Sequence, residues 1–432
     1  MQIKVNYRIL SLVLIFISFA SLFLGFYLDE NSAGAGSYKG DIEIVWKNLQ
    51  IFLANDIISS ILHQDYYTSR TPIVYVFHEI FNPFVENIIS FRRSVFIISL
   101  TLPVLFYFCL KQKFIREDNI LLLLISSTVC LSPYYRTSSY WGLEENYGLI
   151  FLLLTFLSLN SFLKNENQGG YKVHLLLFIS TFFSSCCLYF DQKLIIIPII
   201  CFLKIITSNK LLKFKFFSVF YYFLLSLPYI YLIILWEGLI PSALIENRKL
   251  GNEIFLVHIG YSSTIIAFYL LPLLLFKDKN VVNVVKNFFF NKKNYYLICL
   301  FIIYLAYLIG FFDFNEQSII GKGFIHKISQ ILFNENFSRI IFVYFSFFIS
   351  WIIILIYIEN ELSDILTIVY LFILSVFLWP MFQEYFDPLI LLMAFTFFRS
   401  KLIINYKNST ILYIYLSLLL IGTNIYYANL LN

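Results

Sequence analysis

Long apolar segments alternate with short polar ones along nearly the whole chain. Most apolar segments run for about 15 to 22 residues without a charge, enough for an α-helix to cross a bilayer core of roughly 30 Å. Because the apolar residues are continuous and do not alternate, the pattern predicts an all-α integral membrane protein with about 11 to 13 transmembrane helices. The predicted spans lie at approximately 9–28, 94–110, 119–133, 147–163, 173–190, 194–207, 216–236, 254–276, 295–312, 339–358, 364–380, 386–398 and 410–430.

The longest polar segment, residues 29–93, separates the first two predicted spans. Within it, the apolar positions of residues 41–53 cluster on one helical face, which predicts an amphipathic helix lying in the membrane interface. A second short helix is expected over residues 71–80, after Pro72. No internal repeat is visible, so we expect residues 1–432 to form a single polytopic transmembrane domain without a separate soluble domain.

Basic residues predict the orientation. The first apolar segment resembles a signal peptide, but its length of about 20 residues and the lack of a small-residue cleavage site favour a retained helix with a cytoplasmic N-terminus. The inside segments then hold roughly 18 of the 31 Lys and Arg residues, but only about 7 of the 26 Asp and Glu residues. Glu359 and Glu361, in a predicted inside loop, go against this rule. We expect a multi-pass protein of the inner (cytoplasmic) membrane whose long first loop is external.

Composition narrows the possible functions. With 60% hydrophobic and 13% charged residues, the chain differs from a soluble domain. The net charge of +5 lies mainly in short loops beside spans, so lipids and not nucleic acid are the expected partners. All six cysteines fall within or at the ends of apolar segments without metal-binding spacing, which predicts buried apolar side chains.

Acidic residues follow the first span directly. Asp29 and Glu30 could serve as a general base, or hold a divalent cation such as Mg²⁺ or Mn²⁺, although an isolated acidic pair is also typical of a solvated helix end. Three glycines between Glu30 and Asp41 permit a tight turn that could return Asp41 towards the pair. These three carboxylates are the candidate catalytic residues, and Asp29 and Glu30 are the candidate metal ligands.

Cations in other external segments are candidates for binding a phosphate. Arg70 precedes the helix predicted after Pro72, where a guanidinium can bind two phosphate oxygens and a helix N-terminus favours anions. A lone arginine that meets lipid headgroups would look the same. Lys193 lies with Asp191 in a minimal turn between two spans, where ionisable residues are costly unless they are paired or lie in a polar cavity.

Residues 132–146 form a predicted external loop that combines Arg136 with hydroxyls, an amide, aromatic rings and acids. Aromatic faces and carboxylates together are typical of sugar sites, whereas an interfacial aromatic belt would explain only the rings. A turn at residues 379–388 repeats the aromatic and acidic composition near the C-terminus. The candidate sugar- or acceptor-binding residues are Tyr140, Trp141, Glu144, Glu145, Asp191, Gln383, Glu384 and Asp387.

These features resemble the GT-C class of membrane glycosyltransferases, which take a sugar from a polyprenyl-linked carrier on the outer face of the membrane. Members share an acidic motif at the end of the first span and a long first external loop with interfacial helices, which Asp29-Glu30 and residues 29–93 match. Residues 383–388 are similar to a late turn in several such families, and residues 132–138 to members that use dolichyl-phosphate-glucose.

The resemblance implies a GT-C-like fold and the transfer of one sugar during synthesis of a bacterial surface glycan. The donor would be a polyprenyl-phosphate sugar, and the acceptor a glycan or a lipid-linked molecule. Asp29 or Asp41 would deprotonate the acceptor hydroxyl, and Glu30 would position the acceptor or a metal ion. The leaving lipid phosphate would be neutralised by Arg70, Arg136 and Lys193.

Two other functions remain open from the sequence. An O-antigen or capsule polysaccharide polymerase would use arginine-bearing loops late in the chain, and residues 238–253 with Arg248 and Lys249 are a modest candidate. A polysaccharide flippase or other transporter would place charges near the bilayer midplane and often repeat its halves, and neither pattern is evident here.

Overall fold

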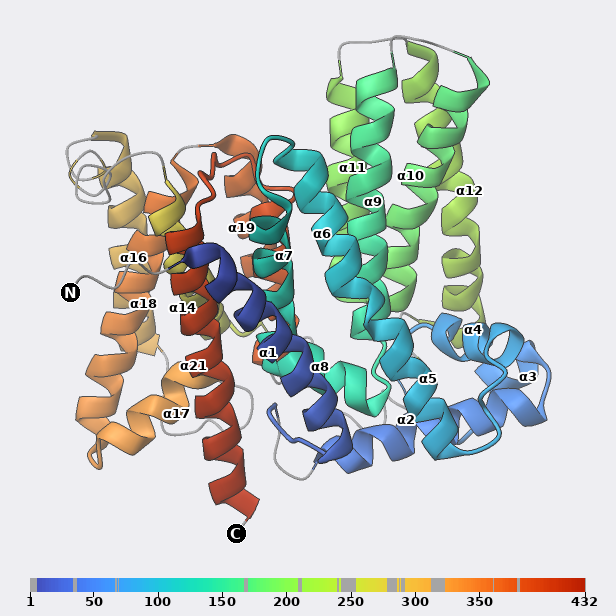
Figure 1. Ribbon diagram of the computed structural model, residues 1–432, viewed down its shortest axis with the longest axis horizontal. Coiled ribbons are helices and arrows are strands. Elements are labelled where there is room, and N and C mark those ends of the chain that lie inside the picture. The colour runs from blue at the N-terminus through green and yellow to red at the C-terminus, as the bar shows by residue number, and fades with distance from the viewer. Residues whose placement is uncertain are drawn as a thin grey trace. The chain divides into compact units, whose positions relative to one another are not determined.

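The computed structural model describes residues 6–33, 37–66, 68, 70–166, 170–208, 212–238, 241, 254–277, 286, 288, 292–311, 323–359, 361–378 and 381–431. Over these residues all regular elements are helices (Figure 1), so the predicted all-α class is confirmed. Three segments singled out above lie outside the described residues, namely Gly34–Gly36, the pair Trp379–Pro380, and 242–253 with Arg248 and Lys249.

Eight described helices are long and apolar enough to cross a membrane, and all eight lie where the sequence predicts spans. They are Tyr7–Tyr27, Ile88–Lys113, Glu145–Asn165, Tyr171–Phe190, Leu212–Trp236, Val257–Phe276, Asn336–Ile358 and Tyr406–Ala428. The pair Asn119–Leu131 and Pro133–Trp141 passes the same criterion only as one broken span bent by 68°.

Among the described residues, the other four predicted spans form shorter helices, so the structure supports about eight of the 11 to 13 predicted spans. A helix rises about 1.5 Å per residue, so three of them, with 12, 15 and 7 residues, fall short of the bilayer core on their own. The four helices are Ile196–Thr207, Tyr295–Phe311, Leu362–Val376 and Leu389–Phe395.

The chain divides into two compact units, which we call the N-terminal unit (Leu12–Leu250 with Leu416–Asn432) and the C-terminal unit (Gly251–Tyr415 with Met1–Ser11). The first half of the chain contains α1 (Tyr7–Tyr27), α2 (Ser37–Ala54), α3 (Ile57–Ile61), α4 (Ile73–Phe81), α5 (Ile88–Ser99), α6 (Thr101–Lys113), α7 (Asn119–Ser127), η1 (Thr128–Leu131), α8 (Pro133–Trp141), α9 (Glu145–Asn165), α10 (Tyr171–Phe190), η2 (Gln192–Ile195), α11 (Ile196–Thr207) and α12 (Leu212–Trp236). The second half contains α14 (Val257–Leu270), η3 (Pro272–Phe276), α16 (Lys292–Phe311), α17 (Gly323–Leu332), α18 (Asn336–Ile358), α19 (Leu362–Val376), η4 (Gln383–Tyr385), α20 (Leu389–Phe395) and α21 (Tyr406–Leu431).

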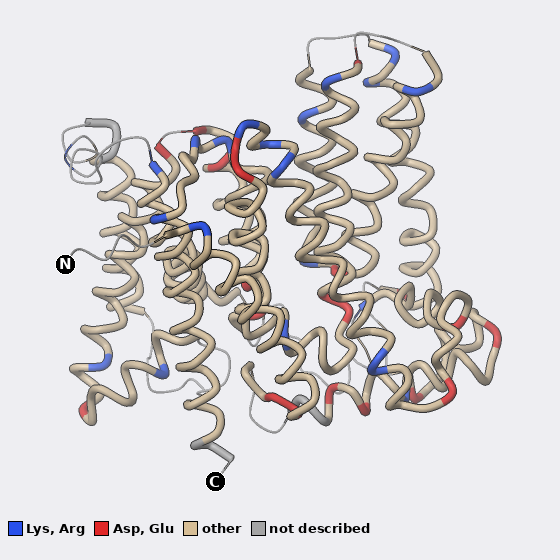
Figure 2. The backbone as a smooth tube through the Cα atoms, in the orientation of Figure 1, with Lys and Arg blue, Asp and Glu red and all other residues tan. Residues whose placement is uncertain are grey.

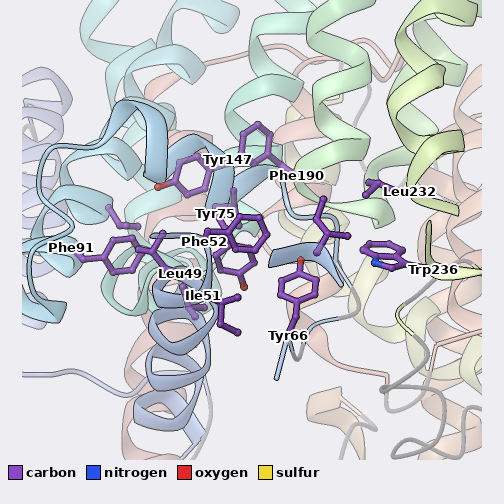
Figure 3. Packing of buried hydrophobic residues seen from close by; sticks show 14 residues of the cluster. Leu49, Ile51, Phe52, Tyr66, Tyr75, Phe91, Tyr147, Phe190, Leu232 and Trp236 are labelled. Carbon is purple, nitrogen blue, oxygen red and sulfur yellow. The ribbon is translucent and has the colours of Figure 1, made fainter. Parts of the chain in front are cut away.

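The two helices predicted in the first loop are present as α2 and α4, which lie with α3 at one end of α9, α10 and α12 (Figure 1). The apolar face of α2 packs on protein, because Val45, Leu49 and Phe52 are buried in one hydrophobic cluster with Tyr75 of α4 and Phe91 of α5 (Figure 3). The amphipathic pattern therefore stabilises this loop against the helix ends. Whether the loop also touches lipid headgroups stays a prediction.

Residues 132–146 are not the loop that the sequence predicts, because most of them form α8. Ser132 caps the helix by accepting a hydrogen bond from the Tyr135 amide at 3.0 Å, and Pro133 occupies its first turn. Gly142, at φ 74°, ends it in the left-handed conformation that glycine adopts without strain. Nearly all side chains of α8 are buried, so its polar groups point into protein.

Charged residues of the N-terminal unit gather near the helix ends (Figure 2). Lysines end α6, α9 and α11, whereas the acids described below lie at the opposite helix ends, together with Arg70, Arg92, Arg136 and Lys193. The orientation in the membrane stays a prediction. The six cysteines are all free. Four are buried as expected, but Cys186 is only partly buried and Cys299 of α16 is exposed.

Candidate functional site

Arg136 of α8 is buried at the centre of the first charged group, and Glu30 is its partner. The Arg136 Nε atom lies 3.0 and 3.1 Å from the two Glu30 carboxylate oxygens, and one Nη atom also pairs with this carboxylate. The remaining guanidinium hydrogens bond the Ser21 hydroxyl, the Ser21 carbonyl and the Cys130 carbonyl. Asn424 of α21 donates a further bond to Glu30 at 3.1 Å. We call Glu30, Arg136, Ser21 and Asn424 the Arg136 cluster.

Glycine at position 25 makes room for this cluster. A Cβ atom there would lie 2.5 Å from an Arg136 Nη atom and 2.6 Å from the Tyr140 hydroxyl, and would also collide with the Glu30 carboxylate. The Tyr140 hydroxyl in turn donates to the Leu22 carbonyl at 2.7 Å. Tyr140, a candidate for sugar binding, is fully buried and holds α8 against α1.

Asp29 pairs with a different arginine, Arg92 of α5, at 2.7 Å. Arg92 also donates to the Tyr140 carbonyl at 2.7 Å and the Phe26 carbonyl at 3.0 Å. Its guanidinium lies 4.0 Å from the ring centre of Trp141, so this candidate sugar-binding ring is engaged in a cation–π contact. The Asp29 side chain is half exposed. The two adjacent carboxylates are thus directed to separate cations.

A second charged group forms where the first loop meets the ends of α9 and α10. Arg70 contacts Glu144 at 2.9 Å with one Nη atom and pairs with Glu145 through the other. The Lys193 ammonium lies 3.4 Å from Asp191 and 3.9 Å from Glu145. Glu144, Glu145 and Asp191 are all buried. These residues come from three segments of the chain, which the sequence analysis considered as separate candidate sites.

Asp41 of α2 completes this group, which we call the Arg70 cluster. Burial and, to a smaller extent, the charge of Glu145 raise the pKa of Asp41 from 3.8 to about 6, although Arg70 opposes this effect. Burial also raises the pKa of Glu144, although Arg70 opposes this effect. Four carboxylates therefore share two cations, and the second oxygen of Glu145 is buried without a hydrogen-bond partner among the described residues.

Hydrogen bonds anchor the backbone that carries Arg70. Thr71 donates from its hydroxyl to the Tyr189 carbonyl at the end of α10. On α4, the His78 ring nitrogens lie 2.8 Å from the Tyr147 hydroxyl and 2.8 Å from the Asn82 amide. Burial lowers the pKa of His78 to about 4, so this histidine is neutral at physiological pH and serves as a structural link between α4 and α9.

The remaining candidates belong to the C-terminal unit. Gln383 and Asp387 are buried, and Gln383 donates to the Tyr269 hydroxyl at 3.4 Å. Glu384 is partly exposed in η4. The members of the Arg70 and Arg136 clusters belong to the N-terminal unit.

The side chains suggested as metal ligands do not fit that role in this arrangement. Asp29 and Glu30 each face an arginine, which competes for the same oxygens. Within the described ranges, no group of three or more His, Cys, Asp or Glu side chains could hold a metal ion.

Comparison with known proteins adds no identification. The chain matches no protein-family model, and no curated protein or solved structure shows significant similarity to it. What the structure supports directly is a polytopic, all-helical membrane protein.

Arg92, Ser21 and Asn424 are site residues that the sequence analysis did not select. Two of them carried a usable signal. Arg92 lies in the predicted external loop, two residues before the span predicted at 94–110, where basic residues are disfavoured, and Asn424 is a polar residue inside the last apolar segment. Ser21 carried none, because a serine in a helix usually bonds its own backbone.

Proposed function

We propose that the protein is a membrane glycosyltransferase that moves a sugar from a polyprenyl-phosphate-linked donor to a glycan or lipid-linked acceptor at its external face. The observation that carries the proposal is the Arg70 cluster. There, Asp41 has a pKa of about 6 and lies close enough to Arg70 and Glu145 for their charges to act on it, at the junction of the first loop and the helix ends. A base that titrates near neutral pH, next to cations that can receive a phosphate, is suited to the transfer of a sugar from a phosphate carrier to a hydroxyl group.

In the proposed reaction, the acceptor hydroxyl gives its proton to Asp41 and its oxygen bonds to the anomeric carbon of the donor. The bond between that carbon and the phosphate oxygen breaks, and the electron pair leaves with the lipid phosphate. Arg70 receives this phosphate in place of a carboxylate, and Lys193 adds a second positive charge. Asp29 and Glu30 act indirectly, because their contacts with Arg92 and Arg136 hold the start of the loop.

The depth of the acids supports an enzyme over a transporter. In the described spans of the N-terminal unit, Glu145 is the first residue of α9, and Asp191 directly follows α10. A transporter needs its ionisable groups near the bilayer midplane, whereas these groups lie at helix ends.

The test is transfer of radiolabelled sugar from a panel of polyprenyl-phosphate sugars, in membranes that hold the wild type, Asp41→Asn or Glu43→Gln. Glu43 is exposed on the same helix and is the matched control. We expect Asp41→Asn to lower the transfer rate by about 10²- to 10⁴-fold, the usual contribution of a general base, and Glu43→Gln to leave it unchanged.

Either of two results would contradict the proposal. One is that well-folded wild type transfers sugar from no donor in the panel. The other is that Asp41→Asn retains the wild-type rate with a donor that the wild type uses.

A further inference from the structure

The Arg70 cluster contains more negative than positive charge, and the proposed reaction does not use the surplus. Its ionisable side chains are Asp41, Glu144, Glu145, Asp191, Arg70 and Lys193. Four carboxylates against two cations leave two negative charges uncompensated when all six groups are ionised. The phosphate of a donor is also negative, so a ligand that brought only a phosphate would increase the imbalance. A buried surplus of one sign is costly unless a ligand or a proton compensates it.

Close packing keeps these acids together. Gly148 of α9 lies one turn after Glu144, and a Cβ atom there would be 3.0 Å from the Asp191 Cβ atom and 2.8 Å from the Leu194 side chain. A glycine therefore allows the turn after α10 to approach the start of α9 this closely. Asp191 is fixed within that turn, because one of its oxygens accepts a hydrogen bond from the Lys193 amide at 3.1 Å. The cluster is thus a built arrangement in which like charges are held side by side.

One oxygen atom of Glu145 indicates where the compensating charge belongs. The Oε1 atom pairs with Arg70 and lies 3.9 Å from the Lys193 ammonium. The Oε2 atom is buried and has no hydrogen-bond donor among the described residues, and the whole side chain is only 9% exposed. Leaving a buried, charged acceptor without a donor is unfavourable, so a ligand that donates a hydrogen bond there gains affinity.

The ligand that meets both requirements is an ammonium group. A hydroxyl would supply the hydrogen bond but not the charge. A metal ion needs several converging ligands, and within the described ranges no three His, Cys, Asp or Glu side chains could hold one. A primary ammonium needs no such geometry, because it donates three hydrogen bonds from one small, positively charged nitrogen.

We propose that the Arg70 cluster recognises a primary ammonium group on the substrate, with Glu145 as the acceptor of its hydrogen bond. The substrates are then amino sugars, or acceptors that carry an amine, in preference to neutral analogues. The phosphate lies against Arg70, and the ammonium group offsets the remaining acids. The inference deepens the proposed function and rests on it for the transfer step, but ammonium binding can be measured without transfer.

Thermal unfolding of the full-length protein in detergent tests the site. The probes are D-glucosamine and D-glucose, which differ by an amine in place of one hydroxyl, titrated at neutral pH and equal ionic strength. D-Glucosamine should raise the unfolding temperature with its concentration, and D-glucose should not. Glu145→Gln should weaken the binding of D-glucosamine about 10- to 100-fold, the usual value of a hydrogen bond to a charged group. Glu43→Gln, at an exposed position of α2, is the control and should bind like the wild type.

Equal shifts with the two sugars would overturn the proposal, as would no shift with D-glucosamine or unchanged affinity in Glu145→Gln. If Glu145→Gln fails to fold because Arg70 loses its partner, Asp191→Asn replaces it. This variant removes one negative charge but keeps an oxygen for the Lys193 amide, and it should weaken D-glucosamine binding in the same direction. Wild-type affinity in a folded Asp191→Asn protein would then overturn the proposal.

Transfer assays identify which substrate carries the amine. Glucosaminyl and glucosyl polyprenyl phosphates are compared as donors, and lipids with a glucosamine or a glucose headgroup are compared as acceptors. A preference for the amine in either pair supports the proposal and assigns its source. D-Glucosamine binding without any transfer would support the ammonium site and contradict the glycosyltransferase, whereas transfer that prefers neither amine would overturn the ammonium site alone.

Discussion

The Arg136 and Arg70 clusters both pair an arginine with glutamates in the N-terminal unit, yet their charges are balanced differently. All five guanidinium hydrogens of Arg136 have acceptors, and its carboxylate partner Glu30 also accepts from Asn424. In the Arg70 cluster, four carboxylates share two cations, and one oxygen of Glu145 is buried without a hydrogen bond among the described residues.

The difference indicates which cluster is structural. A buried charge that is fully hydrogen-bonded fixes a packing arrangement, because removing one partner leaves the other uncompensated. A cluster with excess charge of one sign raises the pKa of its acids and stores unfavourable energy that a proton or a ligand can release. We therefore assign the Arg136 cluster to folding and the Arg70 cluster to chemistry. Four predictions test this assignment.

Arg136→Met should have the largest effect on stability. It leaves Glu30 buried without its cation, and breaking a buried pair in this way costs about 3 to 5 kcal/mol. Thermal unfolding of the detergent-solubilised protein measures the loss. The double variant with Glu30→Gln should recover part of it. A single variant that unfolds at the wild-type temperature would show that the Arg136 cluster is not structural.

Gly25→Ala should destabilise the protein by about 1 to 3 kcal/mol, the usual cost of forcing an extra methyl group into a packed site. The new methyl group would push Glu30 and Arg136 apart. Gly422→Ala is the control, because its Cβ would meet no atom within 4 Å. Unfolding temperatures that change equally in both variants would argue against a tight approach at Gly25.

Asp41→Asn should change stability little below pH 4 and raise it at neutral pH, while lowering the transfer rate by about 10²- to 10⁴-fold. The pKa of Asp41 is about 6 in the folded protein, against the ordinary value of 3.8 for an aspartate, so the folded protein binds more protons than the unfolded chain between these values. Stability contributed by Asp41 is therefore present at low pH and falls as the pH rises through this window. The variant should lack this decline. Wild-type transfer should rise with a midpoint near pH 6, and a flat profile would contradict the role of Asp41 as base.

Lys47→Ala should have the smallest effect. Lys47 and Asp65 are 3.6 Å apart in the same loop, but both side chains are more than half exposed. Water and salt screen such pairs, so we expect a change within about 0.5 kcal/mol in thermal unfolding. A loss comparable to that of Arg136→Met would mean that the loop is sensitive to any charge change, and the comparison of the two clusters would fail.

Hydrophobicity was sufficient to predict the eight long spans, because crossing a bilayer imposes a length of apolar chain that can be counted. It overestimated the number of spans where apolar helices are short, as in Leu389–Phe395. It also missed α8, because the segment after Ser132 is polar and was interpreted as solvated. Ser132, Pro133 and Gly142 are nevertheless typical helix start and stop residues, so local signals could have predicted this helix.

The sequence predicted which residues belong to the two clusters better than it predicted which of them contact each other. The candidates Asp41, Arg70, Glu144, Glu145, Asp191 and Lys193 were selected in three separate external segments, and the structure brings them together. Asp41 was expected beside Asp29 and Glu30, but the charges that act on its pKa are those of Glu145 and Arg70. The assignment of Arg136 to Glu30 could not be predicted, because these residues are 106 positions apart and no local pattern links them. For the same reason, the sequence analysis treated Arg136 as a candidate for phosphate binding, whereas the structure shows it buried and already paired.

The contact between Glu30 and Arg136 also has a consequence for biogenesis. When α1 leaves the ribosome and enters the membrane, Arg136, the partner of Glu30, has not yet been synthesised. Asn424 follows 394 residues after Glu30. An unpaired carboxylate at the membrane boundary remains hydrated. We therefore expect a nascent chain truncated before Pro133 to react at Glu30 with a water-soluble carbodiimide, and the complete chain to be protected. The first helix to be inserted would then be among the last to reach its final packing.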